Sequence, residues 1–160
     1  MRALGWCVAV SLFLCPLASA AAPAKVGVLP VNGDGIDAAA STQLTDGIRA
    51  VGLNYLVPKT AFELMTRDNL EVMLPPGKTL ADCVGTCAVN TAKLMKLQYV
   101  IATRVFLIQG QFRLTVGAYT AETSRPLREL TVGGASVNEV LGKLPNEVGP
   151  VFTAITNVGA

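Results

Sequence analysis

The chain has 160 residues, of which 51% are hydrophobic and 15% are charged, as is typical of a single globular domain. Its 13 Lys and Arg residues are scattered and stand against 11 Asp and Glu residues, so the sequence lacks the basic patch that binds nucleic-acid phosphates. The absence of histidine excludes the nucleophile pairs that need an imidazole base and removes the commonest metal ligand. We therefore expect a protein that is not an enzyme, with no catalytic residues, no metal, no cofactor and no nucleic-acid partner.

The first 20 residues have the pattern of a secretory signal peptide. Arg2 supplies a positive charge, residues 3–17 form an apolar run, and Ala18-Ser19-Ala20 has the small-residue spacing of a signal-peptidase site. The run is shorter than the roughly 20 residues that span a bilayer. We expect cleavage to leave a single domain over residues 21–160 that has no transmembrane segment. This domain would be secreted across the inner membrane and be periplasmic, with an extracellular location as the alternative.

The first elements of that domain are predicted to be a strand and a helix. Residues 25–31 form a Val-rich apolar run that ends in the turn residues 32–35, as a buried strand does. Asp37 is a candidate N-cap, after which apolar residues recur at helical spacing as far as Gly52. We expect the helix to end there.

A second strand and a short helix are predicted next. Residues 53–59 are expected to form a loop because Pro58 interrupts their apolar run. Residues 61–65 are expected to form a strand, and Thr66 is a candidate N-cap for a helix that ends before Pro75.

The second half of the domain predicts a helix followed by three strands. Residues 83–97 are expected to be helical. Residues 99–108 form a β-branched apolar run, and Gln109-Gly110 is typical of a hairpin turn. Apolar and polar residues alternate over residues 112–119, and residues 127–133 complete the set.

The chain is predicted to end in a helix. Ser136 and Glu139 have the spacing of a capping box, and Pro145 and Pro150 are expected to break or kink the helix that follows. The resulting order, β-α-β-α-α-β-β-β-α, predicts an α+β fold with a mixed sheet. Three of its strands would form an antiparallel meander, and the helices would pack on one face of the sheet.

Cys83 and Cys87 are expected to form a disulfide, because a signal peptide would deliver both thiols to an oxidising compartment. The bridge would pin the start of the third helix. The alternative is a redox-active pair activated by the helix N-terminus, although the spacing is one residue longer than Cys-x-x-Cys.

The turn over residues 32–37 can be compared with two ligand-binding loops, and it fits neither. A dinucleotide loop needs an acidic residue about 20 positions further on, and Val57, Pro58 and Lys59 stand there instead. A calcium loop would place Ile36 at a ligand position. We interpret the segment as an ordinary turn, while a small-ligand sensor with a cleft beside it stays open as an alternative function.

The open face of the predicted meander is the candidate partner-binding surface. Alternation along the strands places Arg113 and Tyr119 on one face, together with Arg104. Arginine and tyrosine are enriched among the residues that dominate binding energy in protein interfaces. Plain solvent exposure is the competing interpretation.

Short motifs resemble a known family. Residues 25–32, Lys-Val-Gly-Val-Leu-Pro-Val-Asn, are similar to the first strand and turn of the TolB amino-terminal and CsgG-like (curli-channel-like) domains of the Gram-negative envelope. Residues 64–70, Leu-Met-Thr-Arg-Asp-Asn-Leu, look like the strand-to-helix segment of a secreted branch of that group. That branch also has a Cys-x3-Cys pair before a helix, where Cys83 and Cys87 stand, and then an apolar strand, where residues 97–101 stand.

The resemblance implies a function by contact rather than by turnover. Members of the group include a subunit of a secretion channel, docking domains of envelope machines and an activator of cell-wall synthases. We therefore expect a non-catalytic domain that binds another envelope protein in envelope assembly or as an accessory to an envelope machine. A thiol-disulfide redox protein and the small-ligand sensor are the alternatives.

Overall fold

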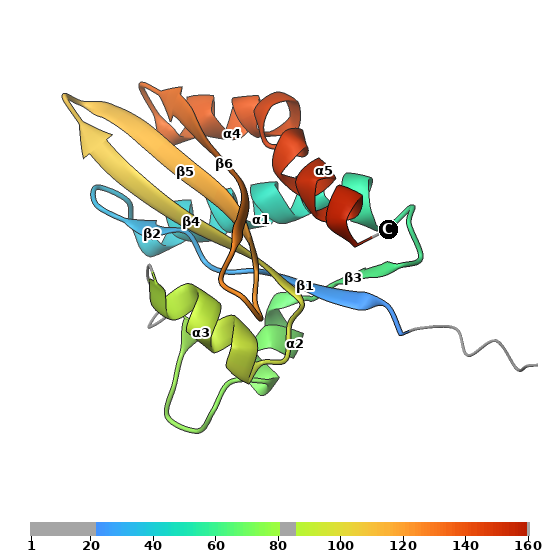
Figure 1. The fold of residues 1–160 in the computed structure, drawn as a ribbon. Coiled ribbons are helices and arrows are strands. Elements are labelled where there is room, and N and C mark those ends of the chain that lie inside the picture. Colours follow the sequence, from blue (N-terminus) through green and yellow to red (C-terminus); the bar gives the residue numbers. More distant parts are fainter. Residues whose placement is uncertain (1–21, 81–85, 160) are drawn as a thin grey trace, which may run out of the picture.

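The computed structural model describes residues 22–80 and 86–159, and within them it has a six-stranded mixed sheet with helices on both sides (Figure 1). The strands are β1 (Ala24–Val28), β2 (Asn32–Gly33), β3 (Phe62–Leu64), β4 (Tyr99–Ile108), β5 (Gln111–Thr120) and β6 (Pro126–Gly134). The helices are α1 (Ala38–Leu56), α2 (Arg67–Val72), α3 (Thr86–Leu94), α4 (Val137–Glu147) and α5 (Gly149–Val158). The predicted signal peptide lies outside the described residues and stays a prediction.

The sheet confirms the predicted α+β class and the antiparallel meander. Its strand order is β3-β1-β4-β5-β6, and the short β2 pairs with β4 beyond the end of β1. β1 is parallel to both β3 and β4, whereas β4, β5 and β6 are antiparallel neighbours. The turn between β4 and β5 has two central residues of positive φ, Gln109 (52°) and Gly110 (75°), as a type I′ hairpin requires.

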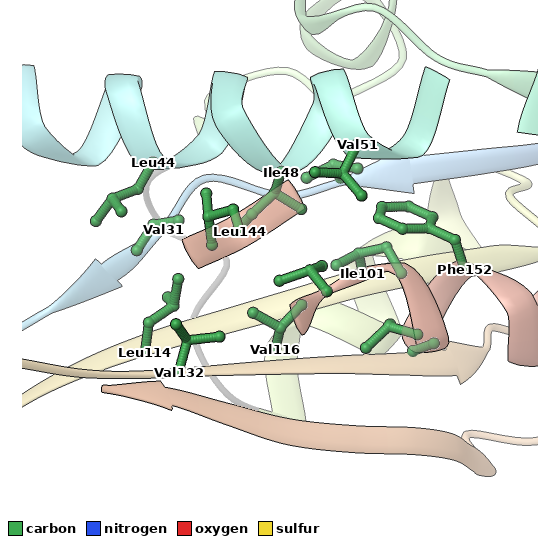
Figure 2. Packing of buried hydrophobic residues seen from close by; sticks show 14 of the residues in the cluster. Val31, Leu44, Ile48, Val51, Ile101, Leu114, Val116, Val132, Leu144 and Phe152 are labelled. Atoms are coloured by element: carbon green, nitrogen blue, oxygen red, sulfur yellow. The ribbon is translucent and has the colours of Figure 1, made fainter. Parts of the chain in front are cut away.

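The main core lies between the sheet and helices α1, α4 and α5. The helical spacing that predicted α1 directs Leu44, Ile48 and Val51 toward the sheet (Figure 2). Phe152 of α5 points into the same core between the helices and the sheet. Apolar side chains from β1, β4, β5 and β6 complete this core.

The prediction that all helices pack on one face was wrong, because α2 and α3 lie on the opposite face (Figure 1). The chain passes from β1 to β3 on one side through α1, then returns across β1 to reach β4 on the other side. Crossover connections between parallel strands are right-handed. Because the connection from β1 to β3 and the connection from β3 to β4 run in opposite directions across the sheet, their helices lie on opposite faces. Val100 and Ile101, successive residues of β4, are consequently both 0% exposed and face different helices.

Helix α1 runs past its predicted end at Gly52 to Leu56, so the first part of the predicted loop is helical. Gly52 is not a helix terminator here but a contact point, since a Cβ on it would lie 2.8 Å from Cε1 of Phe152. The caps were predicted correctly: Asp37 accepts a hydrogen bond from the Ala40 amide at 2.7 Å, and Thr66 accepts one from the Asn69 amide at 3.2 Å.

The C-terminal helix is interrupted at Val148 rather than at either proline. Pro145 lies inside α4, and Pro150 occupies the first turn of α5, where a missing N–H costs no hydrogen bond. Ser136 caps α4 by accepting from the Glu139 amide at 3.2 Å. No helix among residues 22–80 and 86–159 has the length and apolar content needed to cross a membrane.

Candidate functional site

Helices α2 and α3 cover the part of their sheet face formed by β3, β1 and the start of β4, and Tyr119 of β5 packs against the margin of this covered part. The strand register places a row of side chains on the remaining part, which we call the open sheet face. Its members are Arg104 and Phe106 of β4, Arg113, Thr115 and Tyr119 of β5, and Glu129 and Thr131 of β6. The open sheet face therefore carries all three residues predicted for partner binding.

A groove of about 530 Å³ runs across the open sheet face and is walled on one side by α3. Its lining residues are Val89, Asn90, Ala102, Thr103, Arg104, Phe106, Thr115, Tyr119, Ser124 and Glu129. Two of the predicted residues, Arg104 and Tyr119, thus line one groove. The third, Arg113, lies beside it, directly opposite Phe106 in the β4–β5 register.

The two arginines of the open sheet face frame an aromatic ring. The Arg104 guanidinium carbon lies 4.7 Å from the centroid of the Phe106 ring, within the range of a cation–π interaction. The ion pairs seen in the described part of the chain are Arg67–Glu71 and Lys143–Glu139, so neither Arg104 nor Arg113 is paired with a carboxylate there. Both arginines are exposed, so their guanidinium groups can bind a carboxylate from outside.

Tyr119 forms the other end of the groove. Its hydroxyl donates to Oε2 of Glu129 at 2.9 Å, and its ring lies over Gly117, the cross-strand neighbour of Glu129. A Cβ on Gly117 would lie 2.7 Å from Cε2 of the ring, so only glycine leaves room for this arrangement. Burial, with a smaller contribution from the Glu129 hydrogen bond, raises the pKa of Tyr119 from 10.0 to about 12.

The raised pKa predicts that Tyr119 remains a neutral phenol when the folded protein is held at about pH 11. Because the folded pKa exceeds the unfolded one, the contribution of Tyr119 to stability is complete below about pH 10 and is lost as pH rises through about 12. At about pH 11 the ultraviolet difference spectrum of wild type minus Tyr119→Phe should lack phenolate absorption, and urea should make it appear. A full phenolate signal in the folded protein would contradict the assigned environment.

A second cavity, of about 240 Å³, lies beside the turn for which the sensor alternative expects a cleft, and Asn32 lines it. On its wall Arg49 donates from Nη2 to the Val28 carbonyl at 3.2 Å, and burial lowers the pKa of its guanidinium. The carboxylates of Asp46, Asp68 and Glu71 act on that charge. Two of these carboxylates, Asp46 and Glu71, line the cavity together with Arg49 and Arg67, so the formal charges of its lining sum to zero.

The predicted disulfide cannot be placed among the described residues. Cys83 lies outside them, as does the side chain of Cys87. The disulfide and the redox alternative both stay predictions from the sequence.

Sequence reasoning missed several residues of the groove, notably Phe106, Glu129 and Val89. A period of two from Arg104 identifies Phe106, but the sequence analysis took Phe106 only as part of the apolar run over residues 99–108. Glu129 could be placed only with the β5–β6 register, and Val89 only with the position of α3 against the sheet.

Comparison with known proteins gives structural neighbours but no sequence match: neither a protein-family model nor a curated protein matches the chain. The C-terminal domain of LpoB from Escherichia coli aligns with a TM-score of 0.53 at 18% identity, over 74% of this chain and 88% of that one. A lipoprotein from Neisseria meningitidis aligns with a TM-score of 0.53 at 14% identity, over 84% of this chain and 98% of that one. These likenesses show a shared fold.

TolB itself is a weaker neighbour. TolB from Acinetobacter baumannii aligns with a TM-score of 0.46 at 12% identity, over 84% of this chain and 29% of that one, which is too low to carry an argument. The predicted resemblance is confirmed in part, as a fold shared with the LpoB C-terminal domain, while the CsgG-like link and the match of the Cys-x3-Cys pair stay predictions.

Proposed function

We propose that this protein is a secreted, periplasmic, non-catalytic domain of the cell envelope that binds another envelope protein through its open sheet face. Two findings support the envelope assignment. The sequence has the pattern of an exported protein, and the fold is that of the LpoB C-terminal domain and of a neisserial lipoprotein. The binding partner would lie across the meander, on the side that the helices leave uncovered.

The single observation that carries the proposal is the groove of about 530 Å³ with Arg104, Phe106 and Tyr119 in its lining. Arginine and aromatic residues gathered in one depression are the composition of an interface centre. Tyr119 is held by Glu129 and Phe106 is overlaid by Arg104, so the anchoring side chains are already positioned before binding. Preorganised side chains lose little conformational entropy when a partner docks.

The charges of the open sheet face indicate the chemistry of the partner. Arg104 and Arg113 lie on diagonal positions of adjacent strands, and neither meets a carboxylate within the described residues. A partner that brings carboxylate side chains to this row gains charge-assisted hydrogen bonds. Binding should therefore weaken as the salt concentration rises.

The experiment is affinity capture after chemical cross-linking in intact cells, with tagged wild type and a charge-reversed variant, Arg104→Glu with Arg113→Glu. We expect wild type to capture a defined envelope protein. The amount captured by the variant should be at least about tenfold lower, since interface hot spots contribute about 2 kcal/mol or more. Lys59→Glu is the control for charge reversal away from this face, because it reverses one exposed charge in the loop before β3. Equal capture by all three proteins would refute the proposed face.

A further inference from the structure

The outer edge of the sheet, β6, presents backbone groups that the fold leaves unused. The type I′ turn makes Ile108 and Gln111 a hydrogen-bonded pair at the start of the β4–β5 hairpin. Hydrogen-bonded and non-bonded pairs then alternate along an antiparallel ladder. Odd-numbered residues of β5 from Gln111 to Gly117 therefore bond to β4, and even-numbered residues bond to β6.

The register carries this alternation to β6. Leu130 and Val132 lie opposite Val116 and Leu114, so their backbone groups bond to β5. The odd-numbered residues 129, 131 and 133 direct their N–H and C=O groups away from the sheet. A side-chain contact agrees with this assignment, because Lys143 of α4 donates from Nζ to the outward carbonyl of residue 133 at 2.7 Å.

Both ends of the edge are protected and its centre is not. Lys143 occupies the Gly133 carbonyl at one end, and Pro126 has no N–H to offer at the other. Between them, the backbone groups of Glu129 and Thr131 make no hydrogen bond to any described residue outside the strand, and both residues are exposed. Unpaired edge groups of this kind are a template for another strand.

We propose that the edge of β6 over residues 128–132 takes an extended segment of the partner protein as an added strand. This inference rests on the proposed function and states how the same partner is held. The added strand would pair with the amide and carbonyl groups of Glu129 and Thr131, the mode called β-augmentation. Glu129 also lines the groove, so the edge and the open sheet face form one continuous surface.

The partner protein, rather than a second copy of this chain, suits the edge for two reasons. A stable interface buries about 800 Å² on each side and involves about 20–30 residues, far more than the short edge provides. A partner that also covers the open sheet face supplies the remaining contact area. Its carboxylates would then meet Arg104 and Arg113, which a second copy paired edge to edge leaves uncovered.

Residue-resolved amide hydrogen exchange tests the inference on the purified protein, alone and with the envelope protein identified by the capture experiment. In the free protein the amides of Glu129 and Thr131 should exchange fast, while those of Leu130 and Val132 exchange slowly because they bond to β5. In the complex, the Glu129 and Thr131 amides should slow by about tenfold or more. Slow exchange at these two amides in the free protein would overturn the inference.

Thr131→Pro gives a second, independent test. Proline removes an amide hydrogen that faces solvent, and edge strands tolerate proline at such positions. We expect its dissociation constant for the captured protein to rise about tenfold, the loss expected for one buried hydrogen bond and its unsatisfied partner. Thr131→Val is the matched comparison, since it loses the same side-chain hydroxyl of the open sheet face but keeps the amide. The dissociation constant of Thr131→Pro should therefore exceed that of Thr131→Val by about tenfold, and equal values for the two variants would overturn the inference.

The outcomes separate the two proposals. If the complex forms but the Glu129 and Thr131 amides stay fast, the edge inference is wrong and the open sheet face retains its role. If no envelope protein is captured at all, both proposals fail. A wild-type protein that is dimeric in light scattering, and becomes monomeric with Thr131→Pro, would assign the edge to a second copy and overturn the inference.

Discussion

Phe152→Ala is expected to lower the free energy of unfolding by about 3–5 kcal/mol, the cost of removing a fully buried aromatic side chain from a packed core. Phe152 is 0% exposed and lies between α1, α5 and the sheet (Figure 2). Its ring packs so closely on Gly52 that a Cβ there would lie 2.8 Å from Cε1. Because the backbone of α1 cannot move in to fill the cavity that alanine would leave, the full cost should remain. Urea unfolding, followed by circular dichroism, measures it.

Val158→Ala is the control for Phe152→Ala, since it truncates an apolar side chain of the same helix. Val158 is 56% exposed, so its truncation should change the free energy of unfolding by no more than about 0.5 kcal/mol. A Phe152→Ala protein that unfolds at the same urea concentration as Val158→Ala would contradict the packing of the main core.

Gly33→Ala has the second largest expected effect, a loss of about 1–3 kcal/mol, because the added methyl group meets backbone atoms that cannot turn away. A Cβ on Gly33 would overlap the Val105 carbonyl oxygen and lie 2.7 Å from its carbonyl carbon. The substitution should therefore separate β2 from β4 at the Asn32–Arg104 and Gly33–Val105 pairs. Urea unfolding measures the loss, and backbone NMR shifts should change at Arg104, in the groove.

Gly142→Ala is the matched control for Gly33→Ala. Nothing lies within 4 Å of a Cβ at Gly142, which is inside α4, so alanine should raise stability by about 0.5–1 kcal/mol through its better helix propensity. If Gly33→Ala were as stable as wild type and left the NMR shifts of Arg104 unchanged, the pairing of β2 with β4 would be wrong.

Local sequence signals predicted the elements whose causes are themselves local. Asp37, Thr66 and Ser136 cap helices because short polar side chains satisfy the first free amides of a helix. The meander followed from alternation and from a two-residue turn whose geometry glycine favours. These features depend on neighbours within a few positions.

Features that depend on distant contacts were not predictable in this way. The placement of α2 and α3 on the second face follows from the order β3-β1-β4, and hydrophobic periodicity carries no information on strand order. Gly52 resembles a helix terminator in the sequence, yet it is where α1 meets Phe152. The end of α1 was predicted wrongly because the glycine at position 52 serves a tertiary contact and does not terminate the helix.

The candidate site shows the same division. Period-two alternation was sufficient to place Arg113 and Tyr119 on one face of β5, since side chains of a strand alternate between its faces. The groove itself requires α3 to stand beside that face, and the open edge requires the β5–β6 register. Both are properties of the assembled sheet.

The most direct test of the central claim is site-specific photo-cross-linking in intact cells. A photoreactive amino acid would replace Thr115, in the groove, or Gln43, which is exposed on α1 on the opposite side of the sheet. We predict that the Thr115 probe forms an adduct with a single envelope protein and that the Gln43 probe does not. Adducts from Gln43 alone, or the same adducts from both positions, would contradict binding through the open sheet face.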